Sequence, residues 1–155
     1  MIASTHLALG AASGLAIQRT LPDYFGLPER LLAGFALGLI THITADALPH
    51  REYMVVGHKL TAVVVFEIVA ILFLIYYPIP DKTFGLVMFS ALVGAAFPDF
   101  LTISYEHLVA WEWVRNWDNY LHTYHGKIPL GFKINLIDQV LLAIALMGFV
   151  RLVPH

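Results

Sequence analysis

A histidine and an aspartate four residues apart, His42 and Asp46, form the most informative pattern in the sequence. On an α-helix this spacing places both side chains on one face, and His50 follows the same line after Pro49 ends the regular helix. Imidazole nitrogens and carboxylate oxygens are ligands that suit Zn²⁺, Mn²⁺ or Fe²⁺. The pattern predicts a metal site. The alternative is that His42 and Asp46 only hydrogen-bond to each other and stabilise helix packing.

Other side chains could complete the same site. His122 and His125 are three residues apart, a spacing compatible with binding one ion. His6 and Asp99 are predicted near helix ends at the same level, although each of them alone could be a solvated residue. The full set of predicted metal ligands is His6, His42, Asp46, His50, His58, Asp99, His122 and His125.

Three residues are candidates for catalytic roles beside the metal: Asp46, Glu67 and Arg51. Glu67 lies inside an apolar segment, where an ionised carboxylate is costly without a partner. Arg51 carries a planar fork of donors that suits a phosphate, and contact with a lipid headgroup explains it equally well. We predict Asp46 or Glu67 as the general base and Arg51 as the group that neutralises developing negative charge.

The elements that must position these groups are long apolar segments. Hydrophobic residues make up 59% of the 155 residues, charged residues 13%, and the mean hydropathy is +0.73. Soluble globular chains are only about 45–50% apolar. Five segments approach the roughly 20 residues that a membrane-spanning helix needs, namely 2–18, 31–48, 60–79, 84–104 and 134–153. The sequence thus predicts an all-α, polytopic membrane protein with a single transmembrane domain over residues 1–155.

A long polar stretch at about 105–133 separates the last two apolar segments. Leu108, Trp111, Val114, Trp117 and Leu121 recur there at helical spacing, which predicts an interfacial amphipathic helix with an aromatic belt. Consecutive spanning helices alternate in direction, so this stretch shares one membrane face with residues 1–6 and 49–59. Seven of the eight histidines lie on or near that face. Lysine and arginine are shared between both faces, so the orientation in a cell membrane stays open.

Composition also excludes several classes of site and partner. The chain has no cysteine, so thiolate ligands and disulfides are excluded. The net charge is -2 without a basic stripe, which argues against a nucleic-acid partner. The sequence contains no His-Glu-x-x-His motif, no phosphate-binding glycine loop and no nucleophile elbow.

The ligand pattern resembles a known superfamily. The strings that carry the resemblance are Thr5-His6 and His42-x-x-x-Asp46 followed by Pro49-His50, which are similar to the helical ligands of the zinc-dependent phospholipase C and single-strand nuclease superfamily. The chain departs from the soluble phospholipases in lacking an amino-terminal tryptophan and a clear His-x-x-x-Glu pair, and in the shorter gap between Asp46 and His50.

A second group of features resembles the membrane-bound metal-dependent hydrolases of bacteria and archaea. These features are the small size, the several apolar spans, Pro98-Asp99 after an apolar run, and His122-x-x-His125-Gly126. The resemblance implies an α-helical hydrolase with a polynuclear zinc site that acts on a phosphoester.

We therefore expect a membrane-embedded, metal-dependent hydrolase with one to three divalent ions, Zn²⁺ first and Mn²⁺ or Fe²⁺ as alternatives. The aromatic belt at Trp111, Trp113 and Trp117 makes a lipid or another amphiphile the expected substrate, and membrane lipid the expected environment. Two other functions remain open from the sequence: a metal or proton transporter, and a structural membrane subunit with packed polar residues. The oligomeric state stays open as well.

Overall fold

The computed structural model describes residues 3–49, 69, 82–103, 111–123, 126–129 and 131–152. Within these ranges the chain is helical and contains no strand, which confirms the all-α prediction. The helices are α1 (Ala3–Thr20), α2 (Leu27–Ala47), α4 (Lys82–Ile103), α5 (Glu112–Leu121) and α6 (Leu136–Leu152). Four of the five predicted apolar segments correspond to α1, α2, α4 and α6. The remaining segment, 60–79, lies outside the described residues except for Val69.

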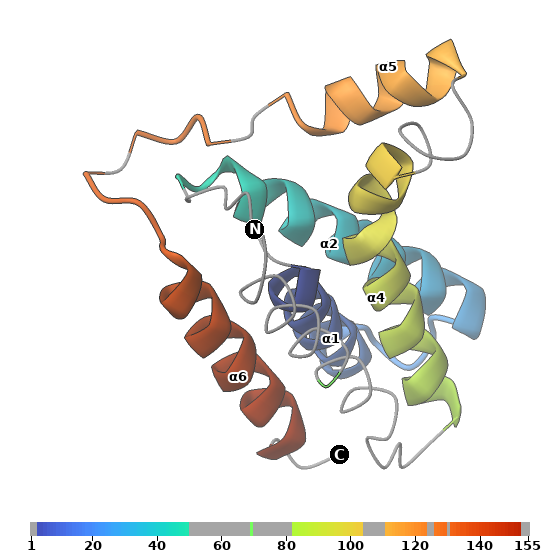
Figure 1. Cartoon of the computed structure of the whole chain (residues 1–155). Helices are drawn as coiled ribbons and strands as arrows, with labels where there is room; N and C mark the ends of the chain where they lie inside the picture. The colour runs from blue at the N-terminus through green and yellow to red at the C-terminus, as the bar shows by residue number, and fades with distance from the viewer. Residues whose placement is uncertain are drawn as a thin grey trace.

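Helix α1 is the centre of the described bundle. It packs against α2, α4 and α6, and α2 in turn packs against α4 (Figure 1). The contact between α1, α4 and α6 is filled by small and apolar side chains. Small side chains let the helix backbones approach each other closely. This core consists of Ala8, Ala11, Leu15, Phe84, Met88, Ala143, Met147 and Val150.

Two glycines bring α2 and α4 into backbone contact. A Cβ atom added to Gly38 would lie 2.1 Å from the carbonyl oxygen of Ala91, and one added to Gly94 would lie 2.1 Å from that of Phe35. No side chain fits at either position, so glycine is required by the close approach. His42 lies one turn after Gly38 on the same face of α2 and therefore points at α4.

Pro98 lies inside α4 and does not end the helix there. The helix continues to Ile103, in agreement with the predicted apolar segment 84–104. Pro98 is fully buried, so packing offsets the hydrogen bond that its missing N–H cannot make to Gly94. Asp99 consequently projects from the last part of a continuous helix.

Helix α5 lies across the end of the bundle where α4 finishes (Figure 1). Val114 and Leu121 are buried against Leu101 of α4. Trp111 and Trp117, predicted as part of an aromatic belt on the same stripe as Val114 and Leu121, are more than half exposed. The apolar stripe therefore divides into a buried aliphatic side and an exposed aromatic side.

The chain after α5 returns to the carboxyl end of α2. The backbone N–H groups of Gly126, Ile128 and Ile134 donate to the carbonyl oxygens of Asp46, Ala47 and Pro49 at 2.7, 3.0 and 2.9 Å. Carbonyls at a helix end lack partners within the helix, and these bonds supply them. The end of α2 that carries Asp46 is thus held under the segment that follows α5.

One described helix is long and apolar enough to cross a membrane, over Lys82–Thr102 of α4. The apolar stretch Ile137–Val150 of α6 is shorter. Helices α1 and α2 carry buried polar side chains that lower their hydropathy, including His6 and His42. Length and composition of one helix do not separate a membrane span from the core helix of a soluble protein, so the five-span arrangement remains a prediction.

Candidate metal centre

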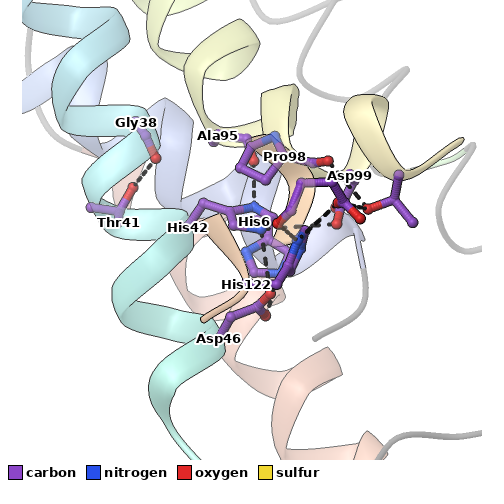
Figure 2. Close-up of polar contacts among 11 residues, drawn as sticks. His6, Gly38, Thr41, His42, Asp46, Ala95, Pro98, Asp99 and His122 are labelled. Carbon is purple, nitrogen blue, oxygen red and sulfur yellow. Dashed lines mark hydrogen bonds and ion pairs between the residues drawn. The ribbon is translucent and has the colours of Figure 1, made fainter. Parts of the chain in front are cut away.

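Side chains from four parts of the chain meet at one end of the bundle. His6 comes from α1, His42 and Asp46 from α2, Asp99 from α4, and His122 directly follows α5. Figure 2 shows the three imidazole rings and the two carboxylates gathered around one point. These are five of the eight predicted ligands.

The carboxylate of Asp46 lies at the centre of the cluster. Its Oδ1 atom is 3.2 Å from Nε2 of His6, and its Oδ2 atom is 3.3 Å from Nε2 of His42 and 3.8 Å from Nε2 of His122. His6 and His42 are 1% exposed. One buried carboxylate therefore faces the same nitrogen of three imidazoles.

A backbone carbonyl orients His42. The Nδ1–H group of His42 donates to the carbonyl oxygen of Ala95 at 2.7 Å, across the glycine contact between α2 and α4 (Figure 2). Because Nδ1 is held by this acceptor, Nε2 is the ring nitrogen that faces Asp46, at 3.3 Å. Metal-binding histidines are commonly fixed in this way by a carbonyl or carboxylate on the other ring nitrogen.

Asp118 orients His122 in the same manner. Nδ1 of His122 lies 3.0 Å from Oδ1 and 3.0 Å from the main-chain oxygen of Asp118. Thr102 of α4 donates its hydroxyl to Asp118 Oδ1 at 2.5 Å and so ties α5 to α4. The imidazole of His122 therefore also presents Nε2 to the cluster.

Several buried nitrogens of the cluster lack a hydrogen bond. Nδ1 of His6 has no hydrogen-bond partner, and Nε2 of His6 and of His42 have only their contacts with Asp46 at 3.2 and 3.3 Å. The two rings are stacked, with centroids 3.9 Å apart. A buried polar atom without a partner costs about 1–3 kcal/mol. An electrophile placed between these nitrogens and Asp46 would satisfy Nε2 of both rings.

The separations fit a divalent cation. Two ligands that each lie about 2.0–2.1 Å from a tetrahedral Zn²⁺ are about 3.3 Å apart. The 3.2 and 3.3 Å contacts of Asp46 with His6 and His42 have this length. A second group, made of His42, Asp99 and His122, also has its ligand atoms within 4.8 Å of one another. The buried His6, His42 and Asp46 can therefore hold a metal ion.

Of the other predicted site residues, one lies at the edge of the cluster and the rest lie outside the described residues. Asp99 lies at the edge, with Oδ1 3.9 Å from Nε2 of His42. The contact named in the alternative is present as well, because Nε2 of His42 lies 3.3 Å from Oδ2 of Asp46 while Nδ1 donates to Ala95. The remaining predicted residues, His50, Arg51, His58, Glu67 and His125, lie outside the described residues.

Comparison with models of protein families, with curated proteins and with solved structures yields no match for this chain.

The groups that orient the histidine ligands were not predicted from the sequence. Asp118 precedes His122 by four residues, which is the same helical spacing that links His42 and Asp46, so a signal was present. Thr102 and the carbonyl of Ala95 gave no signal, because their roles depend on how α4 packs against α5 and α2.

Replacing Asp118 tests whether this orientation matters. Asp118→Ala is expected to weaken Zn²⁺ binding by about 10–100-fold, the usual effect of removing a group that orients a liganding histidine. Competition with a chromophoric chelator measures the affinity, and Asn119→Ala on the exposed side of α5 is the matched control. In a His122→Ala background the Asp118 substitution should add nothing, since the two residues act through one ligand. A full additional loss in that background would show that Asp118 acts elsewhere.

Proposed function

We propose that this chain is a membrane-embedded hydrolase that holds a divalent ion, with Zn²⁺ expected, and cleaves a phosphoester. The observation that carries the proposal is the convergence of three Nε2 atoms on Asp46, with the opposite nitrogens of His42 and His122 held by acceptors. A site built only to pack helices would not need three imidazoles turned toward one buried carboxylate, because buried polar and charged groups are costly.

The residues divide into holding and reacting groups. His6, His42 and Asp46 are buried and would fix the ion, and His122 would complete the set. Such an ion supplies Lewis acidity, which acidifies water and polarises a phosphoryl oxygen. Both oxygens of Asp46 face imidazoles, so we assign it to binding and assign the acceptance of a proton from the attacking water to Asp99, which is 39% exposed on its side chain.

The membrane location is supported by composition and by exposed apolar surface. The span over Lys82–Thr102 and the mean hydropathy of +0.73 both favour it. Large apolar side chains are exposed on both α4 and α6, as expected for helices that face lipid. They are Leu86, Phe89, Val93, Phe100, Ile137, Leu141, Leu142, Ile144, Phe149 and Leu152.

The described core supports hydrolysis over transport. A pathway for ions or protons needs polar groups that continue from the cluster toward the other end of the helices. In the described ranges the contact of α1 with α4 and α6 is filled in that direction by apolar side chains such as Leu15, Met88 and Met147. Between α1 and α2 the hydroxyls of Ser13 and Thr41 lie 3.4 Å apart, so the apolar contact of α1 with α4 and α6 is what favours a reaction site over a pathway.

Hydrolysis by the purified full chain tests the proposal. The Zn²⁺-loaded protein should cleave bis(p-nitrophenyl) phosphate, lose this activity with a chelator and regain it with Zn²⁺. His42→Ala should lower kcat/KM at least about 100-fold, because it removes a ligand and leaves Asp46 without its helix partner. Thr44→Ala, exposed on the same helix between His42 and Asp46, is the control and should match the wild type. A metal-loaded wild type that cleaves no phosphoester would refute the proposed activity.

A further inference from the structure

One face of α4 around Pro98 makes the contacts of this helix with the metal centre. Residues 95, 99 and 102 are separated by four and three positions, so they lie along one side of the helix. Ala95 accepts the hydrogen bond of His42, and Thr102 ties α5 to α4. Asp99 Oδ1 lies 3.9 Å from Nε2 of His42. Pro98 lies among these residues, fully buried inside the helix (Figure 2).

A proline at this position reduces the number of donors that reach the carbonyl oxygen of Ala95. In an α-helix each carbonyl accepts from the N–H four residues later, and the N–H three residues later can share it. For Ala95 the residue three positions later is Pro98, which has no N–H. The proline ring also collides with the carbonyl four residues earlier, that of Gly94, which tends to open the turn. Backbone acceptors freed in this way are commonly satisfied by a group on a neighbouring helix.

His42 is the side chain of the neighbouring helix that reaches this turn. It does so because α2 and α4 are in backbone contact one turn earlier, where a Cβ added to Gly38 would lie 3.0 Å from the main-chain nitrogen of Ala95. The imidazole then donates to the carbonyl oxygen of Ala95 at 2.7 Å. His42 is only 1% exposed, so its Nδ1–H group depends on an acceptor from the protein.

We infer that Pro98 is a positioning residue of the metal centre, because its missing N–H leaves the Ala95 carbonyl to His42 and so fixes the ring with Nε2 toward Asp46. The inference rests on the proposed ion beside Asp46 and not on the reaction that this ion would catalyse. Any other residue at position 98 restores an N–H in this turn. The carbonyl is then shared within α4, and the ring of His42 is held less firmly.

Two substitutions separate the missing N–H from the space that the proline ring fills. Pro98→Ala and Pro98→Val both restore the N–H, and valine also fills most of the space. Both are expected to weaken Zn²⁺ binding about tenfold, the lower end of the usual effect of losing a group that orients a metal ligand. Chelator competition measures the affinity. Pro28→Ala, in the first turn of α2 far from the cluster, is the control and should match the wild type. Wild-type affinity in Pro98→Val would show that the proline only fills space and would overturn the inference.

The Nδ1–H proton of His42 gives a readout that requires neither metal nor activity. In the metal-free full-length protein, a buried imidazole N–H held by a carbonyl exchanges slowly and gives a proton resonance far downfield. His42→Ala assigns the resonance by removing it. In both Pro98 variants we expect an upfield shift and faster exchange with water. An unchanged resonance in these variants would contradict the role of Pro98. A wild type that binds zinc and cleaves no phosphoester would refute the hydrolysis alone, since neither measurement uses that reaction.

Discussion

Asp46→Asn is expected to reduce the affinity for Zn²⁺ by about 100-fold or more, since a structural zinc site derives roughly 10–16 kcal/mol from about four ligands. Asp46 faces Nε2 of all three imidazoles through its two oxygens, whereas Asp118 contacts only Nδ1 of His122. The amide keeps the size of the side chain but removes its charge. Chelator competition measures the affinity of wild type and variant.

A thermal shift gives a second reading of the same substitution. Ligands that bind only the folded state raise its stability by mass action, so excess Zn²⁺ should raise the Tm of the wild type and leave that of Asp46→Asn nearly unchanged. Asp23→Asn is the control, because Asp23 is fully exposed and lies on the loop between α1 and α2, away from the cluster. A variant that keeps wild-type affinity with an unchanged fold would mean that the ion binds somewhere else.

Gly38→Ala is expected to destabilise the folded protein by about 1–3 kcal/mol or more, the usual cost of overpacking. The new methyl group would lie 2.1 Å from the Ala91 carbonyl oxygen, so α2 and α4 must separate. Separation also stretches the 2.7 Å bond from His42 Nδ1 to Ala95. We therefore expect a lower Tm together with weaker Zn²⁺ binding.

Gly148→Ala is the matched control for this substitution. Gly148 lies in α6, and a Cβ added there meets nothing within 4 Å. Alanine is favoured over glycine in a helix interior by about 0.8–1.0 kcal/mol, so this variant should be as stable as the wild type or slightly more stable. Thermal unfolding in detergent measures both. Equal stability of Gly38→Ala and Gly148→Ala would contradict the backbone contact between α2 and α4.

Much of the site could be predicted from the spacing of residues along single helices. The four-residue interval fixes His42 and Asp46 on one helix face whatever surrounds them. The alternation of helix direction then placed His6, Asp99 and His122 at the same end of the bundle. This argument needs only the order and approximate length of the apolar segments, which the sequence shows clearly.

Tertiary packing decided what the sequence could not show. The hydrogen bond from His42 to Ala95 joins residues 53 positions apart and depends on the glycine contact between two helices. The cost of Pro98 inside α4 is visible in the sequence, whereas the packing that offsets this cost is not. The exposure of Trp117 likewise depends on which side of α5 turns toward α4.

X-ray absorption at the zinc edge of the Zn²⁺-loaded full-length protein tests the central claim most directly. The account predicts nitrogen and oxygen ligands at about 2.0–2.1 Å, with the multiple-scattering pattern of three imidazoles that falls to two in His122→Ala. A shell of oxygen atoms without imidazole scattering, or a purified protein that retains no zinc, would contradict the convergence of His6, His42 and His122 on one ion beside Asp46.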